Sequence, residues 1–228
     1  MKKSALLPNV RRALRAAADP ARAAKMQAYM KSEMPYHGVA APELKAVFRE
    51  LFAEYPFASA IEFQAGVLAL WREAKFREER YIAVQLTGHK HAREFQDLAA
   101  LPLYEEMITT GAWWDYVDEL ASNRVGPLLA KYPREMRKNV LAWSRSEDLW
   151  KRRTSIICQL GFGEQTDLEL LFACMKPSLG STEFFLRKAI GWALRQVARH
   201  DPAAVRRYVK EHEAELSGLS KREALKHL

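Results

Sequence analysis

Cysteine is scarce in this chain, and its scarcity excludes two kinds of structure. The 228 residues include only Cys158 and Cys174, which lack the paired spacing of a zinc site and are too few for a disulfide framework. Both lie in apolar segments with helical periodicity, where a free cysteine behaves as a small buried hydrophobe. We therefore expect two buried thiols and neither a structural metal nor a disulfide scaffold.

Other features are missing as well, and each absence narrows the possible functions. No apolar run is long enough for a transmembrane helix, and the N-terminal residues do not resemble a signal peptide, so we expect a cytoplasmic protein. The sequence has no glycine-rich phosphate loop and no nucleophile elbow. Its six histidines do not have the spacing of metal ligands. We therefore expect no cofactor.

The charge of the chain is unbalanced towards the basic side. Lysine and arginine number 36 against 28 aspartates and glutamates, which gives a formal net charge of +8 and an isoelectric point near 9.5. Such an excess favours a polyanionic partner, either nucleic acid or an anionic membrane surface. The excess is modest, and many solvated basic proteins bind neither, so charge alone leaves these alternatives open.

Helical periodicity dominates the apolar pattern. Strand-like alternation is scarce, and the hairpin dipeptides Asn-Gly and Asp-Gly are absent. Capping and stop signals divide the chain into segments of helix length; in chain order they are Pro42, Ser59-Ala60-Ile61-Glu62, Gly88, Gly161, Ser181-Thr182-Glu183 and Pro202. The sequence therefore predicts an all-α fold.

A recurring interval bears on how the helices are arranged. Asp118, Arg153 and Trp192 follow one another at steps of 35 and 39 residues. These steps are close to one two-helix HEAT or armadillo-type repeat, roughly 40–47 residues. In an α-solenoid, residues one repeat apart share an inner, concave surface. Because no identical motif recurs, a helical bundle remains the alternative.

The segment 111–118 has the sequence Gly-Ala-Trp-Trp-Asp-Tyr-Val-Asp and is the most informative in the chain. If it opens a helix, Trp114 and Asp118 stand four residues apart on one face. Asp115 then points elsewhere and complements the helix dipole in the first turn. An indole face beside a carboxylate suits a site that holds a cation.

Several blocks of sequence together carry a resemblance to a known family. In chain order they are Ala28-Tyr29-Met30-Lys31, Trp113-Trp114-Asp115 with Val117-Asp118, Leu149-Trp150 with Arg153, Glu183-Phe184-Phe185 with Lys188-Ala189-Ile190-Gly191-Trp192 and Leu194-Arg195, and Leu219-Ser220-Lys221-Arg222-Glu223-Ala224. In these blocks the chain resembles the DNA alkylation repair glycosylases of the HEAT-like repeat class, the AlkD family. The blocks run from near one end of the chain to the other, so the resemblance covers essentially all of it.

The resemblance implies both a fold and an activity. Residues 1–228 would form a single HEAT-like repeat DNA glycosylase domain, an α-solenoid of two-helix repeats with a concave basic face. It would bind duplex DNA containing alkylated purines and hydrolyse the N-glycosidic bond of positively charged ones, without flipping the base. We expect a monomer with no obligate protein partner and no membrane association.

The resemblance also implies the site residues. The catalytic carboxylate carries over to Asp118, the two site tryptophans to Trp114 and Trp192, and the DNA-binding residues to Arg153 and Tyr29. Judged by residue type alone, each has a simpler interpretation. Asp118 would be a surface carboxylate, Trp192 and Tyr29 packing residues, and Arg153 part of a solvated basic turn.

Further basic residues lie near these blocks and would extend the DNA-binding surface, or else form a charged solvent face. They are Lys151, Arg152, Arg187, Lys188 and Arg195. Two other classes of function also remain open. One is a DNA-binding HEAT-like protein without catalysis that recognises damaged or branched DNA. The other is a protein-binding helical-repeat scaffold with an apolar inner surface.

Overall fold

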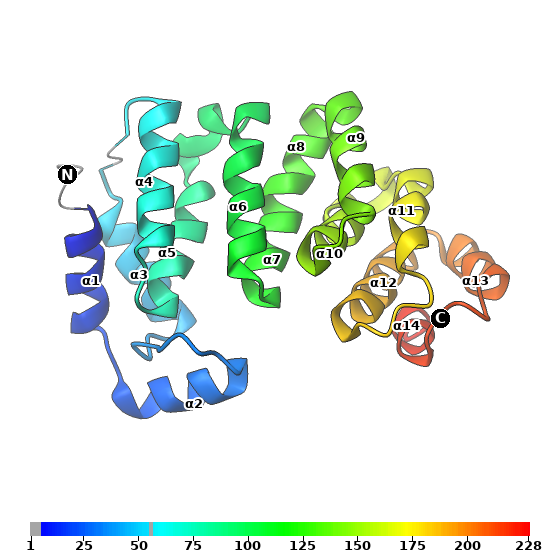
Figure 1. Ribbon diagram of the computed structural model, residues 1–228, viewed down its shortest axis with the longest axis horizontal. Helices are drawn as coiled ribbons and strands as arrows, with labels where there is room; N and C mark the ends of the chain where they lie inside the picture. The colour runs from blue at the N-terminus through cyan, green and yellow to red at the C-terminus, as the bar shows by residue number, and fades with distance from the viewer. Residues whose placement is uncertain (1–5, 55–56) are drawn as a thin grey trace. The chain divides into compact units, whose positions relative to one another are not determined.

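The computed structural model describes residues 6–54 and 57–228, and within these ranges the chain contains fourteen α-helices and no β-strand (Figure 1). It divides into two compact units, residues 1–103 and 104–228, with the boundary in the first turn of α6. That residues 1–228 form a single domain stays a prediction. None of the helices in the described ranges is long and apolar enough to cross a membrane.

Within the described ranges, the first unit contains five complete α-helices. They are α1 (Leu6–Ala16), α2 (Pro20–Met30), α3 (Ala41–Leu51), α4 (Ala60–Arg72) and α5 (Arg77–Thr87). Helix α1 packs on α3, α4 and α5, and α5 also packs on α3 and α4. The helix start predicted at Ser59 is confirmed, since its side chain accepts a hydrogen bond from the backbone N–H of Glu62 (3.3 Å) at the first turn of α4.

A buried carboxylate fixes the loop between α2 and α3. Glu78 on α5 is fully buried and accepts hydrogen bonds from the backbone N–H groups of His37 (2.9 Å), Gly38 (2.8 Å) and Val39 (3.2 Å). Gly38 has φ +85°, and a Cβ there would lie 2.0 Å from the carbonyl oxygen of Asp19. Only glycine fits this close approach, so the loop that follows α2 is held in one conformation.

The second unit contains the remaining helices. They are α6 (Leu101–Gly111), α7 (Trp114–Leu120), α8 (Gly126–Lys131), α9 (Pro133–Ser144), α10 (Leu149–Ile157), α11 (Leu168–Met175), α12 (Phe184–Val197), α13 (Pro202–Glu211) and α14 (Gly218–Ala224). Aspartate side chains cap α10, α11 and α13, at Asp148, Asp167 and Asp201. Helix α10 ends at Ile157, so the stop predicted at Gly161 falls a few residues late.

Helices in the second unit stack in two rows. Helix α9 packs on α11, while α10 packs on α12 and α12 on α14; α10 also packs on α9, α11 and α7 (Figure 1). Helices α9, α10 and α12 each contact both the next helix and the helix after it, which is the pattern of stacked two-helix repeats. The predicted all-α, solenoid-type fold is confirmed, while the concave basic face stays a prediction.

Helix α14 packs unusually closely against α12. Gly191 on α12 lies against α14, and a Cβ at this position would come within 2.5 Å of the Cβ of Glu223 and 3.0 Å of the carbonyl oxygen of Ser220. The hydroxyl of Ser220 donates to the carbonyl oxygen of Arg187 on α12 (2.8 Å). The C-terminal sequence block is therefore part of the structure that holds α12 in place.

We expect Gly191→Ala to lower the free energy of unfolding by about 1–3 kcal/mol, because the new methyl group overpacks the contact between α12 and α14. Urea denaturation followed by circular dichroism measures the change. Gly161→Ala is the matched control, because nothing lies within 4 Å of a Cβ there. Its stability should change by less than about 0.5 kcal/mol. Equal losses in the two variants would contradict close packing at Gly191.

Candidate functional site

The turn into α7 sets the position of Trp114, one of the predicted site tryptophans. Helix α6 ends at Gly111, and Ala112 follows with φ +43°, in the left-handed region that favours glycine. Trp113 is the extended N-cap residue, and Trp114 is the first residue of α7. The prediction that this segment opens a helix is confirmed, so Trp114 and Asp118 lie one turn apart on one face.

Asp118 and Arg153 form a buried, bidentate ion pair. Nε of Arg153 donates to Oδ1 of Asp118 at 2.7 Å, and Nη2 donates to Oδ2 at 2.8 Å. The side chain of Arg153 is only 4% exposed, and that of Asp118 is 17% exposed. Two parallel hydrogen bonds in this geometry fix the plane of the carboxylate as well as its position.

A third hydrogen bond of Arg153 links the pair to α12. Its Nη1 donates to the carbonyl oxygen of Phe185 at 2.6 Å, and its guanidinium carbon lies 5.8 Å from the centre of the Phe185 ring. Asp118 lies on α7, Arg153 in the middle of α10, and Phe185 in the first turn of α12. The site therefore depends on how three helices of the second unit pack.

Aromatic side chains pack beside the ion pair. The rings of Trp113, Trp150 and Phe185 lie within 5.0 to 6.2 Å of one another, centre to centre. Phe184 packs edge-on against Phe185 at 5.3 Å, and 52% of its surface remains exposed. These rings lower the local polarity, so they shield the charges from solvent and strengthen the electrostatic interactions of the site.

Burial changes the acidity of the carboxylate. Loss of solvation raises the pKa of Asp118 above its ordinary value of 3.8. The hydrogen bonds and the positive charge of Arg153 lower this pKa, whereas the negative charge of the nearby Asp115 raises it. The net direction is upward. Without Arg153, both remaining influences would favour the protonated acid.

The helix that carries Asp118 contains an irregular turn. The segment η4 (Ala121–Val125) is π-helical and joins α7 to α8 without a break. Glu119, which lies just before this turn, accepts hydrogen bonds from Asn123 (2.8 Å) and from Arg124 (3.3 Å), both within it. Single π-helical turns occur often at functional sites.

The other residues predicted for the site are placed as follows. Trp114 and Trp192 are half-buried, and Trp192 packs against the core of the second unit. Trp192 lies seven residues after Phe185 on α12, so the two occupy the same face of that helix. Tyr29 lies in the last turn of α2, in the first unit, and is 79% exposed. The roles of these residues in DNA binding and catalysis stay predictions.

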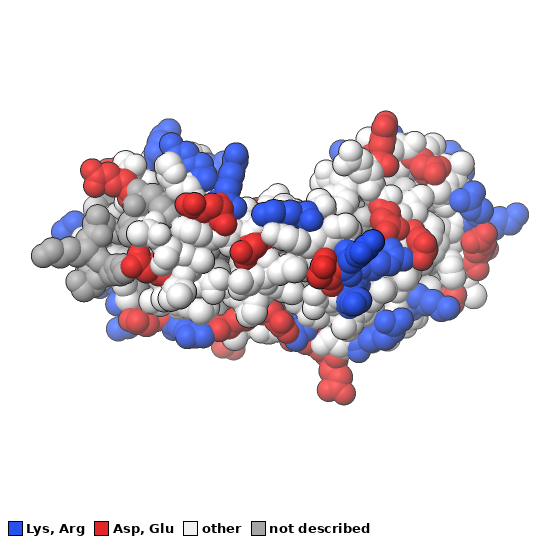
Figure 2. Space-filling model, turned by 90° about the horizontal axis from the view of Figure 1, so that it is seen from above, with Lys and Arg blue, Asp and Glu red and all other residues white. Residues whose placement is uncertain are grey.

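Acidic or polar partners engage four of the five additional basic residues. Lys151 forms an ion pair with Glu105, and Arg152 donates to the Ser178 hydroxyl (3.1 Å) and to a backbone carbonyl. Glu223 accepts from both Lys188 (2.7 Å) and Arg195 (2.5 Å). On the face drawn in Figure 2, basic side chains are likewise interspersed with acidic ones.

Arg187 differs from the other four. Its side chain is half-buried, its Nε is buried, and neither a hydrogen bond nor an ion pair of its guanidinium is found within the described ranges. Arg187 is the fourth residue of α12, near the helix N-terminus, where the helix dipole adds positive potential. Among the predicted phosphate contacts, Arg187 therefore has the least compensated charge.

The two cysteines are buried, as predicted. Burial raises the pKa of the Cys158 thiol far above its ordinary value and that of Cys174 to about 12. Neither thiol is a nucleophile at neutral pH. Among the described residues, no group of three or more His, Cys, Asp or Glu side chains is placed to hold a metal ion.

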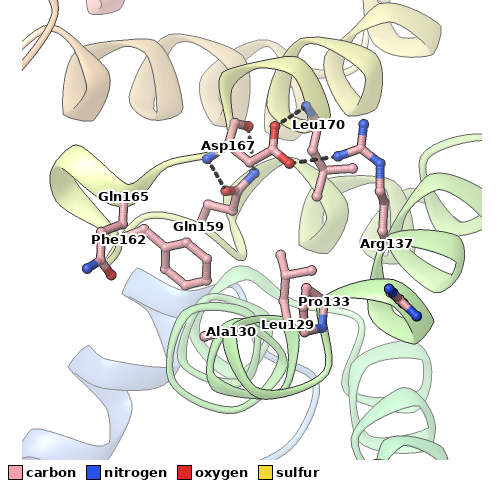
Figure 3. Close-up of a pocket in the computed structure, with 10 residues that line it drawn as sticks. Leu129, Ala130, Pro133, Arg137, Gln159, Phe162, Gln165, Asp167 and Leu170 are labelled. Carbon is pink, nitrogen blue, oxygen red and sulfur yellow. Dashed lines mark hydrogen bonds and ion pairs between the residues drawn. The ribbon is translucent and has the colours of Figure 1, made fainter.

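A pocket of about 340 Å³ lies in another part of the second unit (Figure 3). Phe162 and Leu129 form part of its wall, and Arg137 at its edge is paired with Asp167 and Glu169, each at 2.6 Å. None of the predicted site residues lines this pocket. The ion pair and this cavity are therefore separate features.

Three features near Asp118 were not predicted from the sequence. They are the ion pair of Asp118 with Arg153, the contact of Phe185 with this pair, and the π-helical turn. The spacing of Phe185 and Trp192 by seven residues could have indicated a shared face on α12. The 35-residue step from Asp118 to Arg153 indicated a shared surface in a solenoid, but not a direct ion pair.

Fold and site together define a helical-repeat protein in which one arginine-held carboxylate lies among aromatic side chains. A family model described as "DNA alkylation repair enzyme" matches residues 10–228. The chain belongs to this family.

A solved structure agrees with this assignment. The chain is similar to a "Predicted DNA alkylation repair enzyme from Enterococcus faecalis", with 30% sequence identity and a TM-score of 0.78. The match covers 92% of this chain and 96% of that one. No curated protein matches the sequence. The family is thus shown, whereas the narrower HEAT-like glycosylase class is a prediction.

We expect Ala112→Gly to raise the free energy of unfolding by about 0.5–1 kcal/mol. A left-handed conformation costs a non-glycine residue roughly 1–2 kcal/mol, and the greater flexibility of unfolded glycine offsets about half of the gain. Urea denaturation tests this. The control is Ala198→Gly, where φ is −58°, and there the same change should destabilise by about 0.5–1 kcal/mol. A loss of stability at both positions would argue against strain at Ala112.

Proposed function

We propose that this protein is a DNA N-glycosylase that removes positively charged alkylated purines, such as N7-alkylguanine and N3-alkyladenine, from duplex DNA. The observation that carries the proposal is the carboxylate of Asp118, buried beside aromatic rings and held by Arg153 at 2.7 and 2.8 Å. Membership of the DNA alkylation repair enzyme family supports a DNA substrate. The proposed hydrolysis requires two things: a positively charged lesion and a fixed carboxylate.

The substrate supplies part of the driving force. Alkylation at N7 or N3 gives the purine a positive charge, which makes the base a good leaving group. A general acid is then unnecessary, in contrast to ordinary glycoside hydrolysis, where two carboxylates act together. Neutral purines leave poorly, so the lability of the lesion contributes much of the selectivity.

Asp118 acts on the sugar. As the N-glycosidic bond breaks, positive charge develops on the deoxyribose. A fixed carboxylate in a shielded site stabilises that charge, and it can orient or deprotonate the attacking water. The ion pair uses one lone-pair position on each oxygen of Asp118, so each oxygen retains another for the water or the sugar.

The tryptophans contribute through their ring faces. Trp114 shares a helix face with Asp118, and Trp192 shares one with Phe185 on α12. An indole face beside a cation contributes about 0.5–2 kcal/mol. Such contacts suit a cationic nucleotide that stays in the duplex, since extrusion of the base would cost a few kcal/mol. Absence of base flipping is part of the proposal and rests on the family resemblance.

We expect Asp118→Asn to slow the release of 7-methylguanine from methylated duplex DNA by about 100-fold or more, the usual effect of losing a preorganised electrostatic group. Single-turnover release with excess protein measures the chemical step, and fluorescence anisotropy measures DNA affinity, which should change little. Asp115→Asn is the matched control, because it removes a carboxylate from the same helical turn without touching Arg153.

Two outcomes contradict the proposal. Tight DNA binding by the wild type with no release of 7-methylguanine or 3-methyladenine would favour the non-catalytic binding protein. Equal losses of activity in Asp115→Asn and Asp118→Asn would show that the specific carboxylate is not responsible.

We expect Arg187→Ala to reduce the salt dependence of DNA binding. If its free guanidinium neutralises one phosphate, the slope of log affinity against log salt should become shallower by about 0.9. Arg195→Ala should change the slope less, because Glu223 already compensates Arg195. Binding of undamaged duplex DNA over a salt series is the measurement. Identical slopes for wild type and Arg187→Ala would exclude this contact.

A further inference from the structure

We infer that Arg153 is a positioning residue for Asp118 rather than a ligand of a DNA phosphate. Its guanidinium holds the carboxylate in one orientation and in the charged form. The inference rests on the proposed role of Asp118 and reassigns a residue that the sequence predicts to bind DNA.

The hydrogen bonds of Arg153 explain how the orientation is fixed. All three of its nitrogens are engaged, Nε and Nη2 with the two oxygens of Asp118 and Nη1 with the carbonyl oxygen of Phe185. The backbone contact at 2.6 Å anchors the guanidinium to α12, so it cannot rotate without breaking several bonds. The carboxylate of Asp118 therefore cannot turn about its own axis.

Burial argues against a phosphate contact by the same side chain. Only 4% of the Arg153 side chain is exposed. To reach a phosphate, the guanidinium would have to withdraw from Asp118 and leave a buried carboxylate without a counter-charge. Separation of a buried ion pair typically costs about 3–5 kcal/mol. Arg187, by contrast, has no such bond to break.

The charge of Arg153 also sets the protonation state of Asp118. The surroundings of the carboxylate favour the neutral acid, and only Arg153 opposes them. A neutral carboxylic acid cannot stabilise a cationic sugar through its charge. Arg153 therefore supports the reaction without touching the substrate.

Two variants separate this role from phosphate binding. Arg153→Gln removes the charge, whereas Arg153→Lys keeps a point charge but loses the planar fork. Two quantities are measured for each: the pH dependence of single-turnover 7-methylguanine release, corrected for spontaneous loss, and the titration of the Asp118 carboxyl carbon by ¹³C NMR. Arg137→Gln is the control, since Arg137 also pairs with carboxylates but lies away from the site.

The expected direction follows from the loss of the cation. With the opposite charge removed, the pKa of Asp118 rises, so the carboxylate becomes charged only at higher pH. In Arg153→Gln the NMR midpoint and the acid side of the activity profile should both move up by about 1–3 pH units, the usual effect of a close opposite charge. Arg153→Lys should shift them less, and the salt slope of DNA binding should not change in either variant.

The opposite result would overturn the inference. An unchanged Asp118 titration, together with a salt slope shallower by about 0.9, would identify Arg153 as a phosphate ligand. If Arg153→Gln does not fold, as judged by circular dichroism, the same two criteria apply to Arg153→Lys. If the wild type releases no base, the proposed function fails, but the NMR titration still decides whether Arg153 controls the charge of Asp118.

Discussion

The ion pair between Asp118 and Arg153 buries two charges, and burial of each costs several kcal/mol before their attraction is counted. Such a pair is tolerated only when its hydrogen bonds are well formed, and here Arg153 also needs the carbonyl oxygen of Phe185. This requirement couples α7, α10 and α12, because a shift of any one of them would leave a charge or a donor without its partner. The packing of the second unit and the chemistry of the site are thus subject to the same constraint.

Residues that do not touch the ion pair also help to fix the position of α12. Helix α14 packs on α12 at Gly191, and Glu223 binds Lys188 and Arg195 on that helix. Lys188 and Arg195 lower the pKa of Glu223 below its ordinary value of 4.5, so the carboxylate stays charged in neutral solution. The C-terminal block that resembles the family's sequence therefore acts on the site indirectly, by fixing the helix that supplies Phe185 and Trp192.

What could be predicted from the sequence was mostly local. Apolar spacing, capping residues and the scarcity of strand signals predicted the all-α fold, and the spacing of Trp114 and Asp118 placed both on one face of α7. The 35-residue step placed Asp118 and Arg153 on one inner surface of a solenoid, but their ion pair could not be predicted, because it depends on how α7 and α10 pack. The resemblance implies a DNA-binding role for Arg153, but a basic residue has the same sequence signal whether it contacts DNA or a carboxylate of the protein itself.

The π-helical turn Ala121–Val125 constrains the chain in a way that side chains do not show. This turn adds a residue to a continuous helix. The direction of Asp118 relative to α8 therefore differs from that in an uninterrupted α-helix. Because each residue of an α-helix turns the chain by about 100°, loss of one residue here would re-phase the helix and direct Asp118 away from Arg153. In this short segment, the number of residues is therefore constrained more strictly than their identity, and insertions or deletions would be tolerated less than substitutions.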